Sequence, residues 1–281
     1  MNSMKTVILL GLLTGLIIFF GGVFGGRGGM VLALGVAALM NFVSYWFSDK
    51  IVLKMHGAKE IQQQEAPEVF SIIANLTQKA GMPMPRIYLV DDPAPNAFAT
   101  GRGPTHAAVA VTTGILRLMN REELEGVLAH ELSHVKNRDI LISSIAATLA
   151  GAIMVLAHVA RWGAIFGGFG GRDDERGSNP LSLFAMALLA PIAATLIQLA
   201  VSRSREYEAD ATGAKLVGYP DGLANALRKL GQVSGRIPST TASPAVGHLY
   251  IVNAFSGRSL MSIFSTHPPL QDRIARLLER R

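Results

Sequence analysis

The sequence contains no cysteine, and few of its residues are charged. Without cysteine no disulfide can form, and any zinc site must use histidine and carboxylate ligands. The lack of cysteine also fits a reducing, cytoplasmic location. Charged residues make up 16% of the chain, whereas ordinary soluble domains contain roughly 25%. This deficit indicates a membrane protein.

Long uncharged runs account for the shortage of charge. Four runs hold about 20 residues each, the length needed to cross a hydrocarbon core of roughly 30 Å; they are Thr6–Gly26, Gly28–Ser48, Ile140–Ala160 and Leu181–Ser202. The first is too long for the apolar core of a typical signal peptide, and another run follows at once. We therefore interpret the first two as an uncleaved membrane hairpin. The last two contain His158, Pro191 and Gln198 and could instead be buried helices of a large domain.

Positive charge is distributed unevenly around these runs. Of the 26 lysines and arginines, only Lys5, Arg27, Arg161, Arg172 and Arg176 lie outside the segments 49–139 and 203–281. Because cytoplasmic loops carry an excess of Lys and Arg, we expect both segments and both chain ends to face the cytoplasm from an inner or plasma membrane. We therefore interpret the net charge of +6 mainly as a consequence of this orientation in the membrane. In the absence of a nucleic-acid-binding motif, we expect no nucleic-acid partner.

The residues His130-Glu131-Leu132-Ser133-His134 form an HExxH pattern. Residues four apart lie on the same face of a helix, so His130 and His134 can bind one metal ion. Glu131 is placed to take a proton from water bound to that metal. The alternative is two surface histidines on an amphipathic helix. The preceding residues favour a helix in either case, because Asn120 and Glu123 form a capping-box pattern before an apolar face.

A catalytic zinc site needs a third protein ligand and an open position for water. The best candidate follows the fourth apolar run, in a helical stretch that begins Ser202-Arg203-Ser204-Arg205-Glu206-Tyr207-Glu208-Ala209-Asp210 and ends before Gly218. Glu206 and Asp210 share a face, so Glu206 can bind the metal while Asp210 orients a metal-binding histidine. Glu208 remains a rival ligand on another face. Arg203 is a candidate partner for Asp210.

With the later Thr266-His267-Pro268-Pro269, these motifs resemble those of the HtpX membrane metalloproteases, relatives of the CAAX prenyl endopeptidases. The resemblance covers nearly the whole chain, with three motifs in the same order. It implies one Zn²⁺ bound by His130, His134 and Glu206, with Glu131 as the general base. It also implies an endopeptidase that cleaves damaged or misfolded membrane proteins at the cytoplasmic face, in protein quality control and the stress response.

Two further site predictions concern the substrate. Arg86–Val90, Asn96–Thr100 and His106–Thr112 have the composition of strands and predict a small antiparallel sheet packed on the HExxH helix. We hypothesise that Asn96, Ala97, Phe98 and Ala99 belong to an edge strand that holds the substrate by strand addition; the alternative is an ordinary sheet strand. His267 could donate a hydrogen bond to the oxyanion, or could serve with the two prolines as a helix entry. The resemblance favours the catalytic reading.

The predicted fold is therefore α+β and mostly helical, a multi-pass membrane protein with four hydrophobic helices and a cytoplasmic zincin-like (gluzincin) catalytic domain. We divide it into a transmembrane hairpin (1–48), the HExxH part (49–139), a second transmembrane hairpin (140–202) and the third-ligand part (203–281). Expected partners are the lipid bilayer and membrane-protein or unfolded polypeptide substrates. The rival functions are an intramembrane metalloprotease and a non-catalytic zinc-binding scaffold, which a fourth protein ligand would close.

Overall fold

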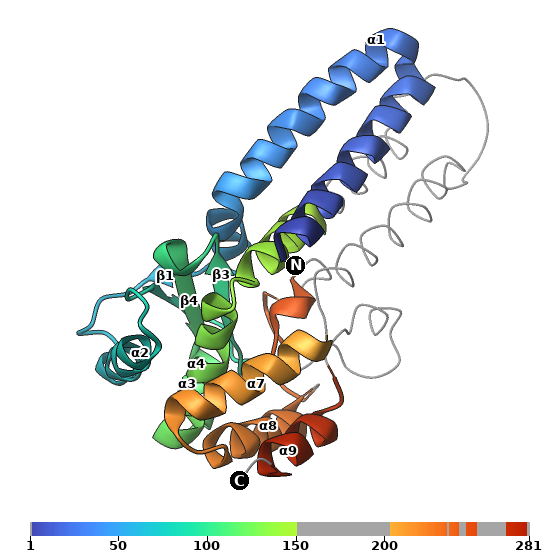
Figure 1. The fold of residues 1–281 in the computed structure, drawn as a ribbon. Coiled ribbons are helices and arrows are strands. Elements are labelled where there is room, and N and C mark those ends of the chain that lie inside the picture. Colours follow the sequence, from blue (N-terminus) through green and yellow to red (C-terminus); the bar gives the residue numbers. More distant parts are fainter. Residues whose placement is uncertain (1, 151–202, 235, 242–245, 252–267, 280–281) are drawn as a thin grey trace, which may run out of the picture.

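The structure is a computed structural model of the 281-residue chain, and it describes residues 2–150, 203–234, 236–241, 246–251 and 268–279 (Figure 1). Its elements, in chain order, are α1 (Asn2–Met55), β1 (Lys59–Glu60), α2 (Pro67–Ala80), β2 (Arg86–Val90), β3 (Ala97–Gly101), η1 (Pro104–His106), β4 (Ala107–Thr112), α3 (Thr113–Leu118), α4 (Arg121–Lys136), the apolar helix Ile140–Ala150, α7 (Arg203–Val217), α8 (Asp221–Val233), η2 (Gly247–Leu249) and α9 (Leu270–Glu279).

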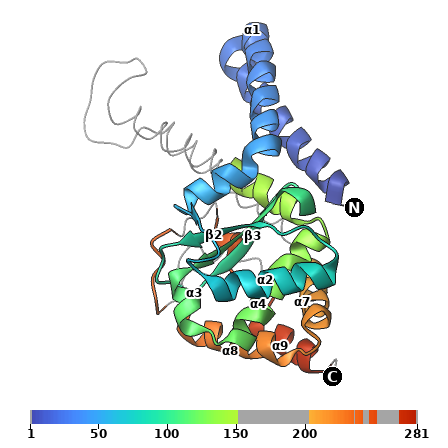
Figure 2. The same cartoon turned by 90° about the vertical axis from the view of Figure 1, so that its left-hand side faces the viewer.

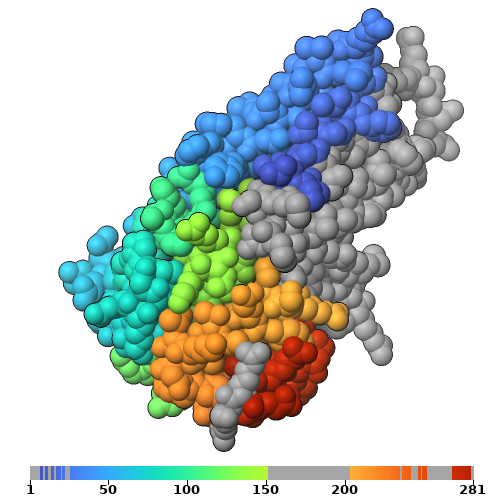
Figure 3. All heavy atoms as spheres, viewed as in Figure 1, coloured from blue at the N-terminus to red at the C-terminus, as the bar shows by residue number. Residues whose placement is uncertain are grey.

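The first element, α1, is a hairpin of two helices. Gly26 has φ 55° and ψ −143°, which breaks the helix in a conformation that glycine tolerates. The two arms lie side by side and project from the rest of the protein (Figures 1 and 3). A side chain on Gly29 would collide with the carbonyl of Gly21, and Asn41 Nδ2 donates a hydrogen bond of 2.8 Å to Thr14 Oγ1 across the hairpin. The predicted hairpin is thus present as a packed pair of helices.

The described residues contain fewer helices of membrane-spanning length than the four that the sequence predicts for the whole chain. Among them, one helix, Gly26–Met55, is long and apolar enough to cross a membrane. The described part of the third run is the shorter apolar helix Ile140–Ala150. The fourth run, Leu181–Ser202, lies wholly outside the described residues, as do the later residues of the third. Four membrane helices therefore remain a prediction.

The sheet corrects one prediction, because it is mixed and not purely antiparallel. Its order is β1-β2-β4-β3. β4 pairs parallel with β2 and antiparallel with β3. β3 therefore lies at the edge of the sheet, and β4, which follows it in the chain, lies between β2 and β3. Strand composition reports burial and does not encode direction or order, which is why the sequence did not predict the parallel pair.

Both faces of the sheet are covered, and this sets the position of the site. Alternate residues such as Ile87 and Val109 face a core shared with α2 and α4, whose helices lie on one side of the sheet in Figure 2. The intervening residues, such as Tyr88 and Ala110, pack on the opposite side with Val52, near the end of α1. The sheet is thus held between the end of α1 and a helical layer that includes α4, the helix with the HExxH motif.

The helix α4 lies at the centre of the helical layer, where it contacts α2, α7, α8, β3 and β4. Its predicted start is confirmed: Asn120 Oδ1 accepts from Glu123 N, and the Glu123 carboxylate accepts from Asn120 N, each at 2.9 Å. Lys229 from α8 adds an ion pair of 2.7 Å to Glu123. The helix α2 starts at Pro67 and ends at Ala80, with Gly81 in the left-handed conformation after it.

Candidate active site

Three side chains from two helices converge at the centre of the molecule. On α4, His130 Nε2 and His134 Nε2 are 3.3 Å apart. From α7, Glu206 places one carboxylate oxygen 3.7 Å from His130 Nε2 and the other 3.6 Å from His134 Nε2. The ligand atoms of the three residues all lie within 4.8 Å of one another. The structure thus brings the two histidines together with a glutamate that lies more than 70 positions later in the sequence.

This donor set fits zinc. Two nitrogen ligands about 2.05 Å from a tetrahedral ion are about 3.3 Å apart, close to the separation of the two histidine Nε2 atoms. Two imidazoles and one carboxylate, with a fourth position for water, are a donor set of catalytic zinc sites. Among the described residues, the cluster contains three such donors and no fourth. A closed structural site would need that fourth protein ligand.

The choice between Glu206 and Glu208 follows from how α7 packs. Glu206 is buried and faces α4, whereas Glu208 is exposed on the other side of α7. The two helices can approach because residue 213 is glycine; a Cβ there would lie 3.0 Å from the backbone nitrogen of His130. Close packing at Gly213 therefore holds α7 at the distance that brings Glu206 to the histidines.

Each histidine is also held by a carboxylate on its other ring nitrogen. His130 Nδ1 lies 2.9 Å from Asp210 Oδ1, as the sequence predicts. His134 Nδ1 lies 3.1 Å from Asp139 Oδ2, a contact that sequence reasoning missed. Arg138 has φ 57°, the one positive φ among described non-glycine residues, and this turn after α4 folds Asp139 back to the ring. Such carboxylates fix the tautomer and orientation of metal-binding histidines.

Arg273 of α9 is a second residue that sequence reasoning missed. Its side chain is fully buried and donates two hydrogen bonds to the Asp210 carboxylate, at 2.9 and 2.7 Å. Its Nη1 also lies 3.8 Å from Glu206. Arg203, proposed from the sequence as the partner of Asp210, is instead exposed at the start of α7. The cation that meets the buried Asp210 carboxylate comes instead from another helix, α9.

Burial and charge shift the proton affinities of these groups. Burial raises the pKa of Glu131, and this outweighs the opposing effect of the two histidines. Burial lowers the pKa of His134, but the hydrogen bond and charge of Asp139, together with Glu206 and Glu131, raise it to about 9. Burial raises the pKa of Asp210, but Arg273 and His130 lower it to about 2. Asp210 therefore stays ionised near neutral pH. The raised pKa of Glu131 suits a group that accepts and then releases a proton near neutral pH.

The strand β3 borders the site at the edge of the sheet. Ala99 N donates a hydrogen bond of 3.0 Å to Glu131 Oε2, so the backbone of the predicted edge strand touches the predicted base. Ala97 is buried. The side chains of Asn96 and Phe98 are engaged elsewhere: Asn96 Oδ1 accepts from Ile251 N, and the Phe98 ring packs 4.4 Å from the ring of His56. The strand therefore faces the site with its backbone groups, while the contacts of the Asn96 and Phe98 side chains hold the strand in place.

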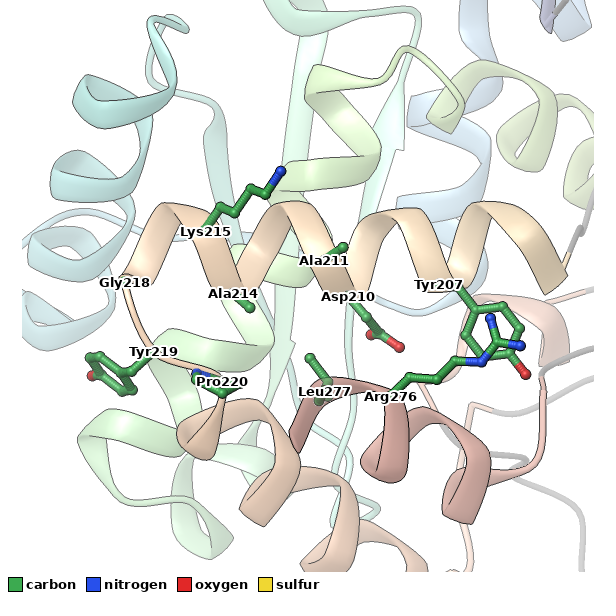
Figure 4. Close-up of a pocket in the computed structure, with 10 residues that line it drawn as sticks. All are labelled: Tyr207, Asp210, Ala211, Ala214, Lys215, Gly218, Tyr219, Pro220, Arg276 and Leu277. Carbon is green, nitrogen blue, oxygen red and sulfur yellow. The ribbon is translucent and has the colours of Figure 1, made fainter. Parts of the chain in front are cut away.

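A cavity of about 290 Å³ lies between α7 and α9, and Asp210 is among the residues that line it. In Figure 4 the Asp210 carboxylate points from α7 toward α9, and the Arg276 guanidinium lies beside the ring of Tyr207, 3.8 Å from its centroid. Neither histidine nor Glu131 lines this cavity. The cavity adjoins the cluster through Asp210, which also contacts His130. His267 lies outside the described residues.

Comparison with known proteins decides the family. Residues 63–281 match the model of peptidase family M48. The chain belongs to this family. Two proteins named "Protease HtpX homolog", from Desulfatibacillum aliphaticivorans and Desulforapulum autotrophicum, are 60% and 56% identical to this M48 peptidase over 276 residues, which is 98% of this chain and 89% of each relative. The family resemblance stated from the motifs is confirmed.

A solved structure also resembles the M48 peptidase. The crystal structure of S. mikatae Ste24p aligns over 98% of this chain and 65% of that one, with 21% identity and a TM-score of 0.49. The M48 peptidase therefore spans about two thirds of the length of that protein. Family membership makes the chain a membrane-associated metalloprotease, a hydrolase of peptide bonds, and the cluster of His130, His134 and Glu206 is a group that could hold its metal.

Proposed function

We propose that the chain is a zinc-dependent endopeptidase that cleaves unfolded or misfolded membrane proteins at the cytoplasmic face of the membrane, as part of protein quality control. His130, His134 and Glu206 would hold the ion. The observation that carries this proposal is the convergence of these three donors, at separations of 3.3–3.7 Å, beside the buried carboxylate of Glu131. When bound, zinc supplies a Lewis acid that makes water a nucleophile near neutral pH.

The residues of the chain perform the proton transfers. Glu131 accepts the proton of the attacking water and passes it to the leaving amine. Its raised pKa, caused mainly by burial, suits a base that must later act as an acid. The N–H of Ala99 holds this carboxylate in the site. A substrate strand would lie along β3 and compete for that N–H, so Asn96–Ala99 are proposed to contact substrate through their backbone.

The oxyanion that forms on the substrate needs a hydrogen-bond donor. His267 is proposed for this role on the resemblance of Thr266-His267-Pro268-Pro269 alone. Asp210, Asp139 and Arg273 are proposed to position the histidines and to exclude other orientations of their rings. None of these three needs to touch the substrate.

The position of the cluster beside an apolar helix supports membrane proteins as substrates. His134 Nδ1 lies 3.1 Å from Asp139 Oδ2, and the apolar helix Ile140–Ala150 begins at the next residue, so the proposed metal-binding cluster lies close to the start of that helix. The excess of lysine and arginine on both polar segments favours the cytoplasmic side. At the cytoplasmic surface of a membrane, the most accessible peptide bonds are those in the loops and unfolded tails of membrane proteins.

The decisive experiment replaces the base without removing a ligand. Purified, zinc-loaded full-length protein in detergent is incubated with an unfolded polypeptide, with and without a chelator. We expect Glu131→Gln to retain stoichiometric zinc in metal analysis and to lose about 10²–10⁴-fold in cleavage rate. Glu122→Gln, an exposed change on the same helix, should cleave normally. Undiminished hydrolysis by the Glu131 variant, or hydrolysis that resists the chelator, would refute the mechanism.

A further inference from the structure

A cavity of about 410 Å³ lies where the end of α1 meets the sheet. Trp46, Phe47 and Lys50 line it from α1, and Arg86, Arg102 and His106 line it from the catalytic part. None of these residues belongs to the cluster around His130, His134 and Glu206. The cavity is therefore a separate feature, built jointly by the membrane hairpin and the domain that carries the metal site.

The lining of this cavity is positively charged. Lys50, Arg86 and Arg102 are the cations, and Asp49 is the one carboxylate among the lining residues. Asp49 is already used, because its Oδ2 accepts a hydrogen bond of 3.0 Å from Arg86 Nη2. In the part of the chain that the structure describes, Lys50 and Arg102 have no carboxylate partner. An anion would satisfy both.

Aromatic rings hold the two unpaired cations instead. The Arg102 guanidinium lies 4.4 Å from the centroid of the Trp46 ring, and Lys50 Nζ lies 5.5 Å from that of Phe47. Both rings are largely accessible, with Trp46 47% exposed and Phe47 40% exposed. A cation on an exposed ring is held by roughly 0.5–1 kcal/mol. Such contacts can give way to a stronger anionic ligand.

The cavity lies at the height of the lipid headgroups. A rise of about 1.5 Å per residue puts Trp46 about 30 Å along its helix from Gly26, the thickness of the hydrocarbon core. Phe42, Tyr45, Trp46 and Phe47 are all exposed, and aromatic rings gather at the membrane–water interface. Lys50 follows within one turn on the polar side. These features place the cavity opening among phosphate groups.

We propose that this cavity binds the phosphate-bearing headgroup of an anionic phospholipid, with Arg102 and Lys50 on the phosphate and with Trp46 and Phe47 against the glycerol and acyl boundary. Arginine matches phosphate with paired N–H donors, and lysine adds a point charge. A zwitterionic headgroup fits less well, since its ammonium would meet three cations and a carboxylate that is already paired. The inference rests on the helix Gly26–Met55 lying in a bilayer and does not require proteolytic activity.

The site is connected to the catalytic residues through the chain. Arg102 stands between Gly101 and Gly103, whose φ values of 136° and 157° disfavour other residues. Gly101 is the last residue of β3, and Ala99 of the same strand holds Glu131. A headgroup bound by Arg102 therefore fixes the loop that follows the strand beside the catalytic base.

The test uses Trp46 as its own reporter. The chain has two tryptophans, so Trp162→Phe leaves Trp46 alone. Full-length protein in detergent is titrated with short-chain phosphatidylglycerol, short-chain phosphatidylcholine or inorganic phosphate. We expect a saturable change in Trp46 emission with phosphatidylglycerol and little change with the other two. Lys50→Gln should weaken the apparent affinity about fivefold, whereas Lys79→Gln, an exposed lysine on α2, should leave it unchanged.

A second measurement covers Arg102, whose replacement alters the reporter directly. Native mass spectrometry counts the phosphatidylglycerol molecules retained after partial delipidation, and Arg102→Gln should lose one of them while its zinc content stays normal. Equal responses to both lipids, or equal weakening by Lys50→Gln and Lys79→Gln, would overturn the proposal in favour of general surface charge. Saturation by inorganic phosphate alone would overturn the lipid assignment in favour of a free-anion site.

Discussion

At the scale of the residue, a carboxylate contacts the Nδ1 atom of each histidine in the HExxH motif. Asp210 holds His130, and Asp139 holds His134. Arg273 in turn neutralises Asp210 with two hydrogen bonds. A buried carboxylate without such a partner would be costly, so Arg273 is the residue that permits Asp210 to remain ionised inside the protein.

The ligand assignment predicts a difference between two neighbouring glutamates. Glu206→Ala removes one of three ligands and should lower zinc affinity by several orders of magnitude. Glu208→Ala, an exposed residue two positions away, should leave zinc affinity and cleavage unchanged. Metal analysis after dialysis against a competing chelator checks both variants. If Glu208→Ala lost zinc and Glu206→Ala kept it, the third ligand would have to be reassigned.

The pKa of His134 predicts how zinc uptake depends on pH. In the metal-free protein this pKa is raised from 6.5 to about 9, so near neutral pH zinc must displace a proton. Apparent zinc affinity should therefore rise about tenfold per pH unit up to about pH 9, and then level off. The same protonation stabilises the metal-free fold below pH 6.5, and this contribution is lost as pH rises through about 9. Zinc titrations at several pH values measure the effect.

Asp139 has two effects on His134: it raises the pKa of the ring and it orients the ring. A variant at Asp139 separates these effects. Asp139→Asn removes the charge that raises the pKa of His134, so the pH dependence should end at a lower pH than in the wild type. The plateau affinity should also fall about 10- to 100-fold, because the ring is less firmly oriented. Zinc affinity that does not vary between pH 7 and 9 in the wild type would argue against this ionisation.

At the scale of the element, the contact between α4 and α7 brings the three proposed metal ligands together. The HExxH helix carries two ligands and α7 carries the third. The spacing of the helices is set where Gly213 meets the backbone of His130. Small changes in that spacing act directly on the distance between Glu206 and the two rings.

Gly213→Ala tests this contact. A Cβ at 3.0 Å from His130 N must push the helices apart, and overpacking of this kind costs about 1–3 kcal/mol. The better helix propensity of alanine returns about 1 kcal/mol. We expect zinc affinity to fall about tenfold or more. Gly35→Ala is the matched control, because a Cβ there meets nothing within 4 Å; a Gly213 variant with normal zinc affinity would contradict the packing argument.

At the scale of the whole molecule, the hairpin projects away from the part that holds the site (Figure 3). If both arms cross the bilayer, the turn at Gly26 and Arg27 lies on the side opposite to the metal. The absence of cysteine makes this simple to test, because one introduced cysteine is the only thiol.

Arg27→Cys and Lys79→Cys are compared in sealed membrane vesicles of known orientation with a membrane-impermeant maleimide. We expect the cysteine at position 27 to be labelled from the outer side, and the cysteine at position 79 only from the cytoplasmic side, where the charge distribution puts the catalytic part. Labelling of both positions from one side would show that the hairpin does not span the membrane. The proposed substrates and lipid site would then need revision.

Much of the site could be predicted because its signals are local. The capping box at Asn120, the i, i+4 histidines and the pairing of Glu206 with Asp210 all depend on helical periodicity, which adjacent residues determine. Asp139 was missed because the chain reverses at Arg138 in a conformation unusual for arginine. Arg273 was missed because it is 63 positions from Asp210, and no periodicity connects them.

The sequence by itself predicted the HExxH helix with its two histidines, the helix that carries Glu206 and Asp210, and the apolar hairpin, since each depends on residues close together in the chain. The tertiary structure decided which distant groups meet. It placed β4 between β2 and β3, chose Arg273 over Arg203 as the partner of Asp210, and brought Glu131 to the backbone of β3. These contacts depend on how helices and strands pack, and packing is set by shape and burial across the whole chain and not by any one segment of it.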